Sequence, residues 1–226
     1  MQPITKYIRD ELNKISDPIK APQMQAYMKT DQPFYGVQSK QCKQVRQDAL
    51  KKYPIENREQ WENVILELWN GAYHEELYQA LKIAERYKIY HDEQSWELFE
   101  RLLRSATNWD TVDGIAPSLI GKLVQNHRHF EKNIWEWTDD ENFWVRRASL
   151  LAHLKHKDKT NTKLLSQTIL KLAHEKEFFI RKAIGWILRQ YSYTDANWVI
   201  QFVNKYEHKL SGLSNREALK AINRNK

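Results

Sequence analysis

The sequence contains very little cysteine, glycine or proline. Cys42 is the only cysteine among 226 residues, which excludes an intrachain disulfide and a zinc site built from several cysteines. Glycine and proline number six each, too few for a chain of tight hairpins. No apolar run approaches the roughly 18 to 20 residues of a membrane helix, and the N-terminus lacks an apolar signal-peptide core. We therefore expect a soluble, helix-rich cytoplasmic protein.

Positive charge is concentrated in the second part of the chain. The net charge is +7, from 36 basic and 29 acidic side chains. Residues 1–143 hold 19 basic and 23 acidic side chains, a balance of −4, and residues 144–226 hold 17 and 6, a balance of +11. Such asymmetry indicates a polyanionic partner, although a solvated basic face with no partner is the alternative. The 9 Trp residues favour a surface that binds phosphates and stacks on sugars or bases, even if most aromatics belong in the core.

Helical periodicity runs through the whole chain. Apolar residues recur at spacings of three and four in one segment after another, which predicts amphipathic helices; one such stripe comprises Trp61, Val64, Ile65, Leu68 and Trp69. No segment alternates apolar and polar residues for long enough to predict a strand. Ser214 and Glu217 have the spacing of a capping box at the start of the last helix. The predicted fold class is all-α.

An internal repeat refines this prediction. FWVRRA (143–148) recurs as FFIRKA (178–183), an offset of 35 residues. The same offset aligns three basic and three small residues, which are Arg146, Arg181 and Arg216, and Ala148, Ala183 and Ala218. A period in the mid-thirties with two helices per unit is typical of a HEAT-like α-solenoid. We expect a single domain over residues 1–226, with 1–56 as an irregular N-terminal helical cap and 57–226 as stacked helix pairs.

One repeat unit carries a carboxylate where the other units carry alanine. Counting back 35 residues from FWVRRA reaches NWDTVD (108–113), which places Asp113 in the alanine position. Trp109 and Asp113 are four residues apart, so a helix would place both on one face. Pro117 is expected to kink or restart this helix. The alternative interpretation is that Asp113 is a solvated or capping acid and Trp109 a core aromatic.

A glycine inside a helical segment marks a second candidate. Gly185 precedes Trp186 in KAIGWIL, and an isolated glycine costs a helix about 1 kcal/mol relative to alanine. The compensation is close approach of another backbone, from either a neighbouring helix or a ligand. The eight histidines form no HExxH motif, and no glycine-rich phosphate loop or GxSxG motif occurs. We predict no metal site and no cofactor.

Four stretches together resemble one protein family. They are MQAYMKTDQPFYGVQ (24–38), WDTVDGIAP (109–117), FWVRRA (143–148) and KEFFIRKAIGWILR (176–189). Over nearly the whole chain, and with almost no shift in spacing, they are similar to the AlkD-type DNA alkylation repair glycosylases. That resemblance implies a HEAT-like-repeat enzyme with a concave basic face. It would remove 3-methyladenine and 7-methylguanine from duplex DNA without flipping the base. An open solenoid with polar ends needs no partner, so we expect a monomer, in the cytoplasm and associated with the nucleoid when it acts on DNA.

The resemblance also implies roles for individual residues. The family's catalytic aspartate corresponds to Asp113, and its two deoxyribose-packing tryptophans correspond to Trp109 and Trp186. The residues that would contact DNA correspond to Arg147, Arg189, Tyr27 and Gln38. Because a purine alkylated at N3 or N7 is already cationic and leaves as a neutral base, one carboxylate suffices to stabilise the charge that develops on the sugar. No amine nucleophile is required, so we expect a monofunctional hydrolase without lyase activity.

Two other classes of function fit the same residues. A catalytically silent HEAT-repeat protein that binds duplex DNA would show the same charge asymmetry but release no base. A HEAT-type scaffold would instead present its basic face to an acidic protein partner. Excision of methylated purines distinguishes an enzyme from the catalytically silent DNA-binding protein. Failure to bind duplex DNA at low salt would favour the protein-interaction scaffold.

Overall fold

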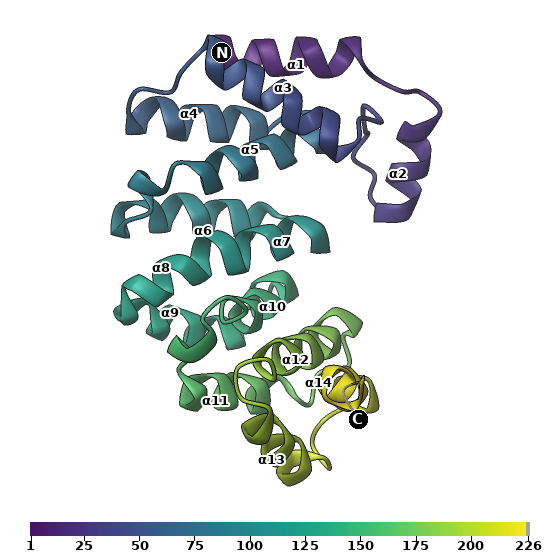
Figure 1. Cartoon of the computed structure of the whole chain (residues 1–226), viewed down its shortest axis with the longest axis vertical. Coiled ribbons are helices and arrows are strands. Elements are labelled where there is room, and N and C mark those ends of the chain that lie inside the picture. Colours follow the sequence, from purple (N-terminus) through teal and green to yellow (C-terminus); the bar gives the residue numbers. More distant parts are fainter. Residues whose placement is uncertain (225–226) are drawn as a thin grey trace. The chain divides into compact units, whose positions relative to one another are not determined.

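The chain folds entirely into helices in the part that the structure describes. The computed structural model describes residues 1–224, and this range contains no strand. The predicted all-α class is confirmed. None of the described helices is long and apolar enough to cross a membrane. The fold divides into two compact units, the first comprising Met1–Tyr90 and the second beginning at His91 (Figure 1).

Five α-helices build the first unit. They are α1 (Pro3–Lys14), α2 (Lys20–Met28), α3 (Ser39–Lys52), α4 (Arg58–Trp69) and α5 (His74–Arg86), followed by a 3-10 turn at Lys88–Tyr90. The apolar stripe predicted around Trp61 lies in α4, and all five of its members are buried. Helix α4 packs on α5, and α1 packs on both α3 and α4. Apolar periodicity therefore identified this helix and its buried face.

A buried carboxylate fixes the loop between α2 and α3. Glu75 at the start of α5 accepts hydrogen bonds from three consecutive backbone N–H groups, those of Tyr35, Gly36 and Val37, at 2.9–3.0 Å. Gly36 has a φ of +82°, a conformation that favours glycine. The loop leads into Gln38, the N-cap residue of α3. Its shape is thus set by one acidic side chain on a later helix.

The second unit contains the remaining α-helices. They are α6 (Trp96–Ser105), α7 (Trp109–Ile115), α8 (Gly121–Asn126), α9 (Glu131–Glu136), α10 (Phe143–Leu151), α11 (Thr162–Leu172), α12 (Phe178–Tyr191), α13 (Ala196–Tyr206) and α14 (Gly212–Arg224). A π-helical turn occupies Ala116–Ile120, and short 3-10 turns lie at Glu93–Ser95, Arg128–Phe130, Trp137–Asp139 and Lys157–Lys159.

The four helices that carry the 35-residue repeat form one layer of the second unit. Helix α7 packs on α10, α10 on α12 and α12 on α14, in chain order (Figure 1). The alanines of the repeat, Ala148, Ala183 and Ala218, are fully buried between these helices. Asp113 occupies the corresponding position of α7. The sequence repeat therefore predicted which helices are neighbours in space.

The repeated arginines have an equivalent structural role in two units. Arg146 donates to the carbonyl oxygen of Asp140 at 2.6 Å, and Arg181 donates to that of Glu175 at 3.0 Å. Each acceptor lies six residues before its arginine, in the loop that leads into the same helix. These arginines stabilise loops within the repeat, so the basic charge of this unit is not all available to a partner.

The helix that carries Asp113 does not stop at Pro117. Helix α7 passes directly into the π-helical turn Ala116–Ile120, which contains Pro117, and continues as α8. Proline has no N–H and prevents a regular α-helical hydrogen-bond pattern, so the wider turn accommodates it. The predicted irregularity is present, as a change of helix type. π-turns of this kind are frequent at functional sites.

Helix α14 approaches α12 closely at the glycine that the sequence singled out. A Cβ atom on Gly185 would lie 2.5 Å from Cβ of Glu217 and 3.0 Å from the carbonyl oxygen of Ser214. The neighbour that Gly185 accommodates is therefore a helix. The predicted capping box of Ser214 and Glu217 is wrong. Helix α14 begins at Gly212, so Ser214 lies inside the helix and is not its N-cap residue. The Ser211 hydroxyl accepts from the Ser214 N–H, and the Ser214 hydroxyl donates to the Arg181 carbonyl.

Candidate active site

A carboxylate and a guanidinium form a nearly buried pair in the second unit. Arg147 of α10 donates from Nε to Oδ1 of Asp113 and from Nη2 to Oδ2, both at 2.9 Å. Its third nitrogen, Nη1, donates to the backbone carbonyl of Phe179 on α12. The Arg147 side chain is 3% exposed and that of Asp113 16%. A forked arginine of this kind fixes a carboxylate in both distance and orientation.

Burial and the guanidinium act on Asp113 in opposite directions. Burial raises the pKa of the Asp113 carboxyl, the hydrogen bonds and charge of Arg147 lower it, and the charge of Asp110 raises it again. The net result is a pKa above the usual aspartate value. A carboxylate with this environment would be protonated more readily without Arg147. Arg147 thus opposes the protonation that burial of the Asp113 carboxyl favours.

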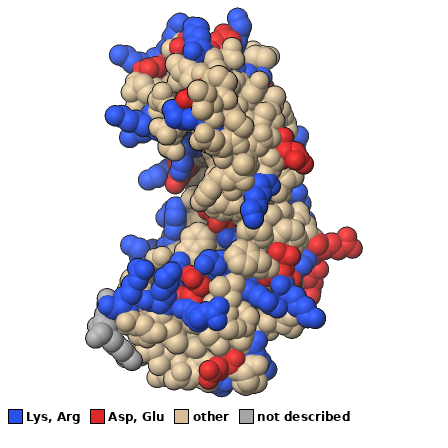
Figure 2. All heavy atoms as spheres, turned by 90° about the vertical axis from the view of Figure 1, so that its right-hand side faces the viewer, with Lys and Arg blue, Asp and Glu red and all other residues tan. Residues whose placement is uncertain are grey.

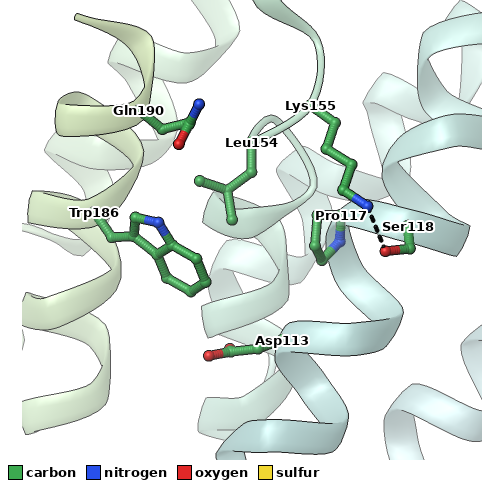
Figure 3. Close-up of a pocket in the computed structure, with 7 residues that line it drawn as sticks. All are labelled: Asp113, Pro117, Ser118, Leu154, Lys155, Trp186 and Gln190. Carbon is green, nitrogen blue, oxygen red and sulfur yellow. Dashed lines mark hydrogen bonds between the residues drawn. The ribbon is translucent and has the colours of Figure 1, made fainter. Parts of the chain in front are cut away.

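Asp113 opens onto a cavity of about 310 Å³. The cavity is lined by side chains from α7, the π-turn, the turn after α10, and α12, which are Asp113, Pro117, Ser118, Leu154, Lys155, Trp186 and Gln190. Figure 3 shows the Asp113 carboxylate and the Trp186 indole extending toward the same space from different helices. Asp113 is the one carboxylic acid among the described residues that line it.

A lysine and a serine form the opposite side of the cavity. Lys155 follows α10 and donates from Nζ to the Ser118 hydroxyl of the π-turn at 2.8 Å (Figure 3). Gln190 lies next to Trp186, one helical turn further along α12. Sequence reasoning missed Ser118, Leu154, Lys155 and Gln190. Only Gln190 had a detectable signal, its i+4 spacing from Trp186.

Trp109 lies on the same helix as Asp113 but does not line this cavity. It is the first residue of α7, is half-buried, and its backbone N–H donates to the Asn108 side chain at 2.7 Å. The predicted i, i+4 relation to Asp113 within one helix is confirmed. The deoxyribose-packing role of Trp109 stays a prediction.

The two candidate DNA-binding arginines differ in environment. All three nitrogens of the Arg147 guanidinium donate to Asp113 or to the Phe179 carbonyl, which does not favour contact with a phosphate. Its DNA-binding role stays a prediction. Arg189 is half-buried on α12, three residues after Trp186, and its Nη1 donates to the Glu217 carboxylate of α14. Glu217 did not stand out in the sequence as a site residue, because its partner lies on another helix.

The remaining predicted site residues belong to the first unit. Tyr27 is in α2 and 74% exposed, and Gln38 is an exposed residue at the start of α3, in the loop that Glu75 fixes. The Gln38 side chain takes part in the capping box of α3, where it accepts from the backbone N–H of Gln41. The DNA-binding role of Tyr27 and Gln38 stays a prediction. Among the described residues, no group of three or more His, Cys, Asp or Glu side chains could hold a metal ion.

The surface of the second unit is rich in positive charge. In the lower part of Figure 2, which shows this unit, Lys and Arg side chains gather into a broad patch with few Asp or Glu side chains among them. The second unit, from residue 91 onward, holds 22 basic and 17 acidic side chains, and its positive excess lies within residues 144–226. Such a surface attracts phosphates at long range.

The helical-repeat layer of the second unit thus holds one shielded carboxylate, Asp113, in a cavity that Trp186 also lines. The model of the DNA alkylation repair enzyme family matches residues 8–222, and the chain belongs to that family. A solved structure described as a predicted DNA alkylation repair enzyme from Enterococcus faecalis is 31% identical, with a TM-score of 0.82. The match covers 91% of this chain and 95% of that one. No curated protein matches the chain.

Family membership confirms the resemblance stated from the four sequence stretches. It supports a role in DNA repair, with DNA as the substrate. The lesion, the bond cleaved and the residues responsible are finer questions, which the geometry of the site addresses.

Proposed function

We propose that the protein is a monofunctional DNA glycosylase that hydrolyses the N-glycosidic bond of cationic alkylated purines, 3-methyladenine and 7-methylguanine, in duplex DNA. One observation carries the proposal: Asp113 is held by Arg147 and faces a cavity that Trp186 also lines. In this proposal the protein acts as a monomer and without a cofactor. It works in the cytoplasm, associated with the nucleoid.

The leaving group explains why one carboxylate is enough. Glycosidases normally use a pair of carboxyl groups, one of which protonates the leaving group. A purine alkylated at N3 or N7 carries a positive charge already and departs as a neutral base. Two tasks remain, which are to stabilise the oxocarbenium-like sugar and to orient the attacking water. A fixed anion in a poorly hydrated site does both. Asp113 supplies that anion.

Arg147 and Trp186 complete the environment of the sugar. Arg147 keeps Asp113 ionised and fixes the direction of its oxygens. The π face of Trp186 attracts a cationic sugar, a contribution of about 0.5–2 kcal/mol. Trp109, on the helix of Asp113, is proposed to pack on the same deoxyribose from the other side of the carboxylate.

The lining of the cavity supports excision without base flipping. Enzymes that flip a base hold it between aromatic or apolar side chains and read its edge through hydrogen bonds. Here Trp186 is the one aromatic among the described lining residues, so no second ring is available to hold a flipped base between two aromatic side chains. The proposal is that the protein contacts the sugar and backbone of a lesion that stays in the duplex.

Release of methylated purines from duplex DNA tests the proposal. Duplex DNA treated with a methylating agent is incubated with the protein and with Asp113→Asn, and free 7-methylguanine and 3-methyladenine are measured. We expect release by the unmodified protein and a loss of at least about 100-fold in the variant. Duplex binding without release by the unmodified protein would support the catalytically silent alternative.

Borohydride trapping tests the absence of lyase chemistry. Lys155 is the one amine among the described residues that line the cavity, and it donates to Ser118. A lyase forms a Schiff base that borohydride reduces to a stable protein–DNA adduct. We expect no adduct during excision. An adduct that disappears in Lys155→Gln would show that the enzyme is bifunctional.

A further inference from the structure

An acidic side chain lies at the centre of the cations of α12 and α14. The Glu217 carboxylate is 12% exposed, lies 3.0 Å from Lys182 Nζ and 3.8 Å from Lys220 Nζ, and accepts from Arg189 Nη1. Burial raises the pKa of Glu217, but the hydrogen bond from Lys182 and the charges of Lys182, Arg189 and Lys220 lower it below the usual value. The carboxylate is therefore a stable anion inside a basic surface.

The position of this carboxylate is fixed by helix packing. Cβ of Glu217 lies against Gly185, where a side chain would collide with it. One turn earlier in α14, the Ser214 hydroxyl donates to the Arg181 carbonyl of α12 at 2.9 Å. These contacts fix the position of the Glu217 Cβ atom relative to α12. The carboxylate beyond it is held by its ion pairs with Lys182 and Arg189.

Arg189 is the side chain that connects Glu217 to the candidate active site. Arg189 follows Trp186 by three residues and precedes Gln190, and both of these line the cavity. Residues three apart on a helix share a face, so Arg189 lies on the side of α12 that carries Trp186, although it is not itself a lining residue of the cavity. Arg147 cannot serve there, because its nitrogens are bound to Asp113 and Phe179.

We infer that Glu217 is a positioning residue, which orients Arg189 toward a DNA phosphate at the rim of the cavity without touching DNA itself. The inference rests on the proposed function in that the cavity acts on DNA. A single donor of Arg189, Nη1, is bound to Glu217, and a guanidinium has several N–H groups in a fixed fork. An arginine held at one end presents the others in a defined direction.

The charge and the geometry of Glu217 have opposite effects on DNA binding. A carboxylate repels phosphates, so removing its charge alone strengthens binding. Removing its hold on Arg189 weakens binding. Glu217→Gln and Glu217→Ala remove the same charge, but only glutamine keeps an acceptor oxygen for Arg189. The difference between these two variants therefore isolates positioning from charge.

The experiment is a set of affinities for a duplex that contains a stable abasic analogue, measured by fluorescence anisotropy. We expect E217A to bind about 5- to 10-fold more weakly than E217Q. In an Arg189→Gln background the two variants should bind equally, because the residue through which Glu217 acts is gone. Circular dichroism establishes that each variant is folded.

Glu175 provides a matched control. It is 13% exposed and pairs with Arg146 at 2.5 Å, in the same unit but away from the lining of the cavity. E175A and E175Q should bind the duplex with equal affinity. If E217A does not fold, Glu217→Asp replaces it: the charge remains, the reach is shorter, and the expected loss of affinity again depends on Arg189.

Each other outcome counts against the inference. Equal affinities of E217A and E217Q, or a difference that persists in the R189Q background, would overturn it. No duplex binding by the unmodified protein would overturn it together with the proposed function. The affinities could follow the expected pattern although the protein releases no methylated base. That result would contradict the proposed glycosylase function and still support the positioning role of Glu217.

Discussion

At the scale of single residues, the pair of Asp113 and Arg147 combines two requirements that normally conflict. A carboxylate that stabilises a developing cation acts more strongly when water is excluded, but burial also favours its protonated, inactive form. Arg147 relieves the conflict, because two hydrogen bonds keep the carboxylate charged. A pair so nearly buried is sensitive to the loss of either partner.

Arg147→Gln should move the acid limb of the pH–rate profile to higher pH. In the proposed mechanism Asp113 acts as an anion, and burial already raises its pKa. Without the lowering effect of Arg147 the pKa rises further, so activity is lost at a higher pH as the solution is acidified. Excision rates between pH 4 and 8 measure the shift. An unchanged acid limb would show that Arg147 does not govern the ionisation of Asp113.

The same variant has an expected effect on stability with a defined pH dependence. At neutral pH, R147Q leaves a buried carboxylate uncompensated, which lowers the free energy of unfolding by about 3 kcal/mol. The pKa of Asp113 is raised in the folded state. The loss of unfolding free energy therefore exists above that pKa and shrinks as the pH falls through it. Arg146→Gln is the control: it breaks the bridge to Glu175 but does not touch Asp113, so the acid limb stays in place.

His153 should make the protein sensitive to acid. Both of its ring nitrogens are buried without a hydrogen-bond partner, and burial lowers its pKa to about 3. Between about pH 6.5, its pKa in the unfolded chain, and its folded-state pKa, His153 binds a proton only when the chain is unfolded. The free energy of unfolding therefore decreases as the pH is lowered. We expect about 2 kcal/mol less stability at pH 5 than at pH 7 from this residue. Urea unfolding of His153→Leu, which should lack this dependence, provides the comparison.

At the scale of helices, the closeness of α12 and α14 organises one wall of the site. Gly185 allows the contact, the Ser214 hydroxyl anchors it, and Trp186, the residue after Gly185, lines the cavity. The helix that bears Trp186 is thus positioned by a helix that contributes nothing to the lining of the cavity.

Gly185→Ala tests this packing. Alanine favours a helix by about 1 kcal/mol, but its Cβ would lie 2.5 Å from Cβ of Glu217, an atom that cannot rotate away. The overlap should outweigh the propensity gain and lower the free energy of unfolding by about 1–3 kcal/mol. Urea denaturation measures it. Gly212→Ala is the control, since its nearest neighbour is the flexible end of Arg216, and equal effects of both substitutions would contradict this view of α12 and α14.

Sequence patterns predicted these elements better than their detailed contacts. Apolar periodicity identified α4, and the 35-residue repeat identified the layer of α7, α10, α12 and α14, because burial imposes a regular spacing on each helix. The partner of Asp113 was not recognisable, since Arg147 lies in another repeat and its direction depends on packing. For the same reason the α14 cap was misplaced, and neither the π-turn nor Lys155 was predicted as part of the cavity.

At the scale of the whole molecule, the net charge of +7 is the sum of two unlike parts. Residues 144–226 have a balance of +11, and part of that charge is used inside the fold, where Arg146 and Arg181 bind backbone carbonyls. Arg147 is likewise bound to Asp113, and Lys182 and Arg189 are paired with Glu217. In the proposed function, the cations that stay exposed on the second unit contact phosphates.

Duplex affinity should therefore depend steeply on salt. Each phosphate contact contributes a slope of about −0.9 to log K against log salt, so four contacts predict an affinity about 100-fold weaker at 200 mM than at 50 mM salt. Anisotropy titrations of undamaged duplex give the slope. A flat dependence would show that the basic surface does not bind the DNA backbone.

The single-turnover rate of base release from a duplex with one 7-methylguanine decides whether Asp113 performs the chemistry. The unmodified protein and Asp113→Asn are compared at saturating protein, with duplex affinity measured in parallel. We predict that the variant binds the duplex at least as tightly, because one negative charge is lost, and releases the base at least about 100-fold more slowly. Equal rates, or a slower release that merely follows weaker binding, would contradict a catalytic role for Asp113.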